Sequence, residues 1–126
     1  MYKIGLDLTN DLVELDLQGF WTESEFDQFI VDERAALNKL QCQIGKHVLL
    51  CDLTNLNVVA QDVGTRIATD LNSQGPRDAE WIAIVINSAL LKLQFQRLLT
   101  RSNAQIFDEA TTAREWLLSS SGRIRT

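Results

Sequence analysis

The chain has 126 residues, of which 45% are hydrophobic and 23% charged, and its formal net charge is −5 at neutral pH. This length and composition predict one globular domain with its own core and exclude a disordered or fibrous chain. The longest apolar stretches fall far short of the ~20 residues that cross a bilayer, and no secretory signal is recognisable, so we expect a cytoplasmic protein without a transmembrane segment. A chain with this net negative charge would repel the phosphate backbone of a nucleic acid, which argues against nucleic acid as a partner.

The residue types that usually carry chemistry are sparse. Cys42 and Cys51 lack the spacing of a zinc or redox motif, and His47 is the only histidine. Cys51 lies in an apolar run, where a thiol behaves as a small hydrophobe. The sequence also lacks a nucleophile elbow, a Walker loop and a dinucleotide fingerprint. We therefore predict no metal site, no cofactor and no enzymatic activity.

The first elements form a predicted hairpin. Residues 2–8 alternate between apolar and polar side chains, and the alternation resumes over 12–17 after the turn-forming pair Thr9-Asn10. Thr22 and Glu25 then form a predicted capping box, with Trp21 and Phe26 as the hydrophobic staple. The helix that follows should end near residues 41–45. Its predicted buried stripe is Phe26, Phe29, Ile30, Leu37 and Leu40, and its predicted polar side is Asp27, Glu33, Arg34 and Lys39.

Strands and helices alternate in the rest of the chain. The continuous apolar runs predict strands buried on both faces, and Ser88 is a predicted helix cap. We expect a turn at 75–78, strands at 46–53, 81–86 and 104–107, helices at 62–71, 88–100 and 108–118, and a flexible tail at 119–126.

This order predicts a single α/β domain over residues 1–118. Its sheet should be mixed and mostly parallel, with about five strands, an N-terminal β-hairpin and four helices.

Three segments resemble the STAS domains and their SpoIIAA-like (anti-sigma-factor-antagonist-like) relatives. They are the strand end Asp52-Leu53-Thr54, the strand 83–86 with its following helix, and the segment from Ile106 to Leu117, in which a Phe and an acidic turn precede a Trp-Leu helix. The resemblance covers about residues 2–118. It implies a regulatory domain that binds a protein partner rather than catalysing a reaction.

In the partner-switching members of that family, an Asp-Ser-Ser-Gly motif after this strand carries the phosphorylated serine. An ungapped alignment from Asp52 places Ala60-Gln61-Asp62-Val63 there, so Asp62 occupies the switch position. Asp62 is then either a fixed, phosphate-like charge at a helix start or an ordinary helix-start residue. A small gap would bring Thr65 to the site. The resemblance implies a constitutive partner surface at Thr54, Asn55, Asn57, Gln61, Asp62 and Thr65.

The helix over 88–100 has an apolar face that is wider than one stripe. Leu90 and Leu93 point away from the line of Leu91, Phe95 and Leu98, which indicates either deep burial or an external contact. We expect Leu90, Leu93 and Arg97 to form a homodimer surface or a ligand surface.

A second hypothesis is a small apolar or lipid-like ligand, because SpoIIAA-like proteins resemble the lipid-binding CRAL-TRIO fold. The candidate pocket lining is Trp21, Phe26, Phe29 and Trp81, with ordinary core packing as the alternative for all four.

Overall fold

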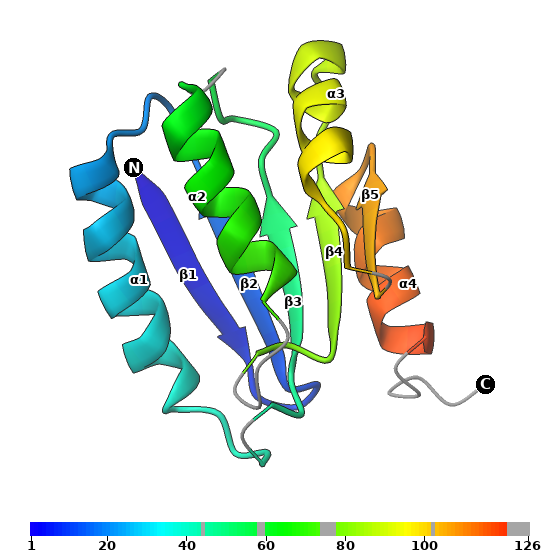
Figure 1. Cartoon of the computed structure of the whole chain (residues 1–126). Coiled ribbons are helices and arrows are strands. Elements are labelled where there is room, and N and C mark those ends of the chain that lie inside the picture. Colours follow the sequence, from blue (N-terminus) through cyan, green and yellow to red (C-terminus); the bar gives the residue numbers. More distant parts are fainter. Residues whose placement is uncertain (44, 58–59, 74–77, 102, 121–126) are drawn as a thin grey trace.

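A computed structural model describes residues 1–43, 45–57, 60–73, 78–101 and 103–120 (Figure 1). These residues form one five-stranded sheet in the order β1-β2-β3-β4-β5. The strands are β1 (Tyr2–Asp7), β2 (Leu12–Leu17), β3 (Val48–Asp52), β4 (Trp81–Val85) and β5 (Ala104–Phe107). The helices are α1 (Glu23–Leu37), α2 (Gln61–Asn72), α3 (Ala89–Leu98) and α4 (Ala110–Ser120). The predicted α/β class, hairpin and mostly parallel sheet are confirmed.

β1 and β2 form the antiparallel hairpin, and the remaining neighbours pair in parallel. Asp7 lies opposite Leu12 across the hairpin end. The turn between them places Asp11 at a φ of 51°, a left-handed conformation that Asp tolerates. The Asn10 side chain donates to the Asp7 carboxylate at 2.9 Å, which holds the turn.

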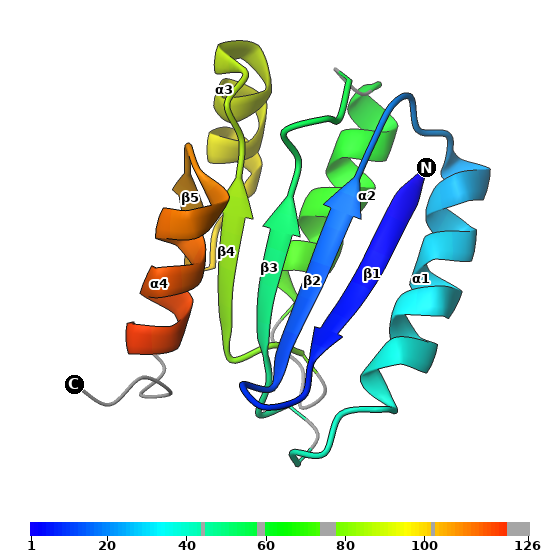
Figure 2. The same ribbon diagram turned by 180° about the vertical axis from the view of Figure 1, so that it is seen from behind.

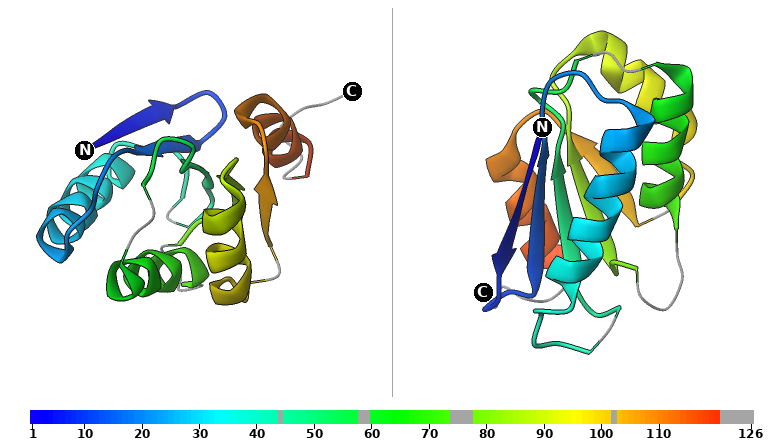
Figure 3. Two further views of the ribbon diagram at one scale, coloured as in Figure 1. Left: turned by 90° about the horizontal axis from the view of Figure 1, so that it is seen from above. Right: turned by 90° about the vertical axis from the view of Figure 1, so that its left-hand side faces the viewer.

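The sheet lies between two unequal helical layers. Helices α1, α2 and α3 cover one face, while α4 lies alone on the other (Figure 3). Seen from behind, α4 lies over the β4–β5 side and leaves the outer part of β1 and β2 uncovered (Figure 2). The core is divided accordingly: Leu49 and Cys51 of β3 join the larger cluster, and Leu50 joins the smaller one beneath α4. Burial of β3 on both faces is thus confirmed.

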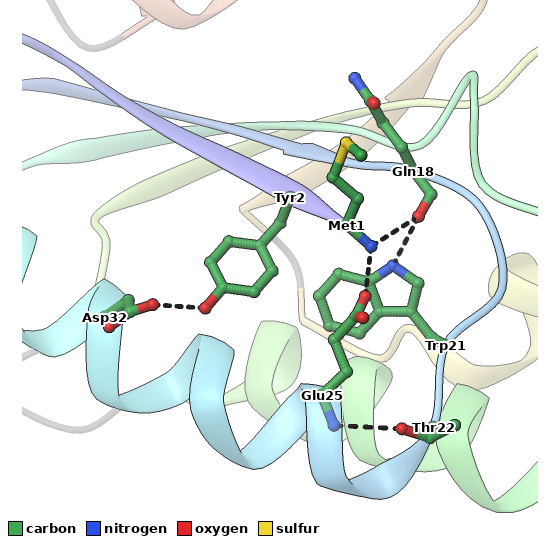
Figure 4. Close-up of polar contacts among 7 residues, drawn as sticks. All are labelled: Met1, Tyr2, Gln18, Trp21, Thr22, Glu25 and Asp32. Carbon is green, nitrogen blue, oxygen red and sulfur yellow. Dashed lines mark hydrogen bonds and ion pairs between the residues drawn. The ribbon is translucent and has the colours of Figure 1, made fainter.

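The start of α1 follows the predicted cap and staple. Thr22 Oγ1 accepts from the amide of Glu25 at 3.2 Å, and the Trp21 and Phe26 ring centroids are 6.5 Å apart. In the predicted capping box, the Glu25 carboxylate reaches back to Thr22. In the structure, Glu25 Oε1 instead contacts the amino group of Met1 (Figure 4). The difference arises because β1 brings the amino terminus over the first turn of α1.

Several predicted boundaries differ from the structure by a few residues. Helix α1 ends at Leu37, with Asn38 as its C-cap, earlier than predicted. Helix α4 continues to Ser120, so the first two residues of the predicted tail are helical. The rest of that tail and residues 75–77 of the predicted turn (75–78) lie outside the described residues. Within the described part of the chain, no helix is both long and apolar enough to cross a membrane.

Candidate functional site

The carboxyl ends of β2, β3 and β4 meet at the upper edge of the sheet, together with the amino ends of α2 and α3 (Figure 1). In open α/β sheets, ligand sites form at this edge where the strand order reverses. Here the described strands follow one another in sequence order, so their order does not reverse at this edge. The edge is formed by loops, which suits a contact surface better than an enclosed pocket.

Gly19 joins the first two loops of this edge. Its amide donates to Asn55 O at 2.9 Å, and its carbonyl accepts from the Asn57 amide at 3.0 Å. Gly19 adopts a φ of 75°, which only glycine reaches at little cost. The next residue, Phe20, is 81% exposed, the largest fraction among the exposed large hydrophobic side chains. The chain therefore presents a whole aromatic ring to solvent beside the loop after β3.

The neighbouring indole points inward. Trp21 Nε1 donates to Gln18 O at 3.1 Å (Figure 4), and its ring lies 5.7 Å from Tyr2 and 5.5 Å from Phe29. Tyr2 in turn donates to Asp32 of α1, and this hydrogen bond raises the pKa of Tyr2 to about 12. Packing of Trp21 between β1 and α1 thus fixes the backbone from which Phe20 projects.

The loop after β3 is held by a local turn. Asp52 Oδ1 accepts from both the amide and the hydroxyl of Thr54, at 2.9 and 2.7 Å. Leu56 anchors the loop in the core, whereas Asn55 and Asn57 are exposed. The two amide side chains remain at the surface on either side of that anchor.

Helix α2 begins beside this loop. Ala60 is its N-cap and supplies no side-chain hydrogen bond, and Asp62 is the acidic residue of its first turn. A carboxylate there is stabilised by ~0.3–1 kcal/mol through the helix dipole. The Thr65 hydroxyl donates to Gln61 O at 2.8 Å. All of Gln61, Asp62 and Thr65 are exposed.

We define the upper surface as Phe20, Asn55, Asn57, Gln61 and Asp62. All of these except Phe20 are predicted site residues. The other two predicted residues lie nearby, with Thr54 partly buried behind the loop and Thr65 one turn along α2.

On α3, the wide apolar face is divided between core and solvent. Leu91 and Phe95 are fully buried, whereas Leu90 is 62% and Leu93 53% exposed. Arg97 is also exposed and continues their side of the helix. These three residues, the α3 stripe, therefore form an external surface.

The aromatic side chains proposed as a pocket lining pack against one another. Phe26 and Phe29 lie 6.1 Å apart beside Trp21, and Trp81 packs edge-on against Trp116 at 5.7 Å beneath α4. With these contacts, the four aromatic rings pack as part of the hydrophobic core.

No family model and no curated protein matches the sequence. Among solved structures, the chain is similar to an uncharacterized protein of the DUF3478 family with a SpoIIAA-like fold, from Shewanella loihica PV-4. The TM-score is 0.65 at 17% identity, over 92% of this chain and 93% of that chain. The chain has a SpoIIAA-like fold. The resemblance inferred from the sequence is confirmed at the level of fold.

A cleft opens at the opposite end of this SpoIIAA-like domain, between the lower halves of α1 and α2. It measures about 570 Å³ and adjoins a smaller cavity of about 30 Å³. We call it the acidic cleft. Its polar lining includes Glu33, Arg34, His47, Asp70, Ser73 and Asp78.

Two carboxyls of the acidic cleft have unusual protonation. Burial, together with the nearby charge of Asp70 and Asp78, raises the pKa of Glu33 to about 8. Burial and the charge of Asp78 raise the pKa of Asp70 to about 6. Glu33 Oε2 is buried and has no hydrogen-bond partner within the described residues. At neutral pH, Glu33 therefore keeps its proton.

Arg101 lines the smaller cavity but does not pair with these acids in the contacts described. Its guanidinium donates to the carbonyls of Ser73, at 2.9 Å, and Ala79, and to the side chain of Asn103. Burial lowers the pKa of Arg101. This arginine holds backbone segments together.

Phe20 and the acidic cleft were not predicted from the sequence. An aromatic residue beside Trp21 would be expected in the core, and only the adjacent Gly19 indicates the turn that exposes Phe20. Placing Glu33 on the polar side of α1 was wrong: it is four residues after Phe29 and four before Leu37, within the apolar stripe. A carboxylate within the apolar stripe of a helix is the sequence feature that could have indicated this buried acid.

Proposed function

We propose that this SpoIIAA-like domain is a non-catalytic interaction module that binds a protein partner through the upper surface. The observation that carries the proposal is Phe20, an aromatic side chain exposed beside a rigidly bonded loop. Large aromatic side chains supply much of the energy at protein interfaces, and surrounding amides supply hydrogen bonds at the rim. Asn55 and Asn57 are exposed, and their backbones are hydrogen-bonded to Gly19, the residue before Phe20.

We further propose that binding is constitutive. The switch position expected from the STAS resemblance is Asp62, which has no hydroxyl for a serine kinase to phosphorylate and carries its negative charge without a kinase. Its place in the first turn of α2 supports this idea, because a negative charge is stabilised there. The partner would then meet a permanent negative charge on the upper surface.

The lipid-ligand alternative has less support. It needs a cavity lined by apolar side chains, whereas Trp21, Phe26 and Phe29 pack ring against ring. The largest cleft among those described has a mixed lining, in which Leu37 and Leu40 lie beside the charged groups of Glu33, Arg34, Asp70 and Asp78.

Affinity capture from the native source tests the proposal. The tagged domain should recover a protein partner, and Phe20→Ser should reduce that recovery at least tenfold, because interface aromatics contribute about 2 kcal/mol or more. The matched control is Val31→Ser, on the outer side of α1, where the side chain is 60% exposed. Equal recovery with both variants, or recovery of lipid without protein, would contradict the proposal.

Phosphosite mapping tests the constitutive part separately. After incubation with extract of the native source, we expect no modification at Thr54 or Thr65, since both hydroxyls are engaged in local hydrogen bonds. Phosphate on either threonine would refute the fixed-charge interpretation while leaving the upper surface as the contact.

A further inference from the structure

The acidic cleft lies away from the upper surface and carries a separate inference. We propose that it is a proton-sensitive switch: the lower halves of α1 and α2 stay together while Glu33 and Asp70 carry at most one negative charge, and separate when both are ionised. The proposal concerns the cleft geometry and does not depend on the proposed partner surface.

The carboxyls of Glu33 and Asp70 face the same buried space from different helices. Glu33 comes from α1 and Asp70 from α2, and both line the cleft and the smaller cavity. Asp78 adds a third carboxylate, which accepts from the Ser73 hydroxyl at 2.6 Å. Like charges gathered in a poorly solvated space repel strongly, so a proton on Glu33 is what allows this packing.

Among the described contacts, no ion pair joins Arg34 or Arg101 to either carboxyl. Arg34 favours the charged forms of both acids but lies at the exposed mouth of the cleft, and the guanidinium of Arg101 is bonded to carbonyls and an amide. The Cys51 thiol lies behind the cleft and is held neutral by burial. Among the described residues, the charged and titratable groups around Glu33 are Arg34, Cys42, His47, Cys51, Asp70, Asp78 and Arg101.

The upper halves of α1 and α2 are joined to each other. Arg66 of α2 pairs with Asp27 of α1 at 2.5 Å and lies 4.6 Å above the Phe26 ring. The lower halves have no such cross-link in the contacts described. Repulsion between Glu33 and Asp70 would therefore rotate the lower half of α1 away from α2 about this upper attachment.

The direction of the pH effect follows from the raised pKa values. The closed arrangement holds protons more tightly than an open, solvated one, so raising the pH favours opening. With pKa values of about 6 for Asp70 and about 8 for Glu33, one negative charge is present between these values and two above them. The cleft should be closed near pH 6 and increasingly open above pH 8.

Nuclear magnetic resonance of the full chain tests the switch between pH 5.5 and 9.5. The carboxyl carbon of Glu33 should titrate near pH 8, and the protection factors of amides 34–38, corrected for intrinsic exchange, should fall at least tenfold across that titration. Amides of α4 should not change in this way. Glu33→Gln should abolish the fall, and the control Glu115→Gln, on the exposed side of α4, should retain it.

Titration of Glu33 near its ordinary value, unchanged protection across the range, or an equal fall in Glu33→Gln would each overturn the proposal. Should Glu33→Gln not fold, Asp70→Asn decides in its place. With the charge at position 70 removed, the Glu33 pKa should drop and the loss of protection should shrink; an unchanged Glu33 titration would contradict the switch.

Discussion

At the scale of single residues, the upper surface depends on a contrast between two neighbours. Trp21 turns inward to pack between β1 and α1, while Phe20 faces solvent. Gly19 makes this reversal possible, because its left-handed backbone and its two hydrogen bonds to the next loop direct the following side chain outward. The exposed ring is thus a consequence of backbone geometry at a position that favours glycine.

A glycine comparison tests this reasoning. Gly19→Ala should lower the free energy of unfolding by about 1 kcal/mol, because an L-residue is strained at positive φ. No heavy atom lies within 4 Å of the added Cβ, so the cost is conformational rather than a clash. Gly5→Ala, where the nearest atom is 3.9 Å away and no positive φ is found, should be neutral or slightly stabilising. Urea denaturation gives both values; equal midpoints would contradict the argument.

At the scale of elements, α3 differs from the other helices of its layer in what it leaves uncovered. Its buried side inserts Leu91 and Phe95 into the core, and its outer side carries Leu90 and Leu93 in contact with solvent. Two exposed leucines one turn apart, followed by Arg97, have the spacing of a helix that packs against another helix. We propose that the α3 stripe is the homodimer contact, separate from the upper surface.

Sedimentation velocity tests the role of the α3 stripe. The wild type should form a dimer at micromolar concentration, and the double change Leu90→Ser with Leu93→Ser should weaken dimerisation at least tenfold by removing apolar contact. The matched control replaces two other exposed residues of α3, as Ala89→Ser with Gln96→Ser. A wild type that stays monomeric, or a control that dissociates equally, would contradict the proposal.

At the scale of the whole molecule, the order of elements could be predicted because each one has a local signal. Alternation marked β1 and β2, continuous apolar runs marked β3 and β4, and the Ser88 cap marked the start of α3, where its hydroxyl accepts from the Leu91 amide at 3.4 Å. These signals span a few residues each, so one sequence suffices to read them. The upper-surface residues other than Phe20 follow, since strand ends and helix starts share one edge.

The acidic cleft could not be predicted because its parts are distant in sequence. Glu33 and Asp70 belong to different helices, and only the packing of α1 and α2 on one face brings them together. The exposure of Phe20 depends likewise on two backbone hydrogen bonds to a loop more than thirty residues further along the chain. Glu33 in the apolar stripe and Gly19 before Phe20 are local signals, but neither one identifies the distant segment that it contacts.

The most direct test of the central claim is to map the recovered partner onto the domain. Amide chemical shifts of the labelled chain should be followed as that partner is added. We predict that the changes concentrate at residues 18–20, 54–57 and 61–65, which meet at the upper edge of the sheet. Changes confined to the β1 edge, to α4 or to the acidic cleft, with the upper surface unaffected, would contradict the account.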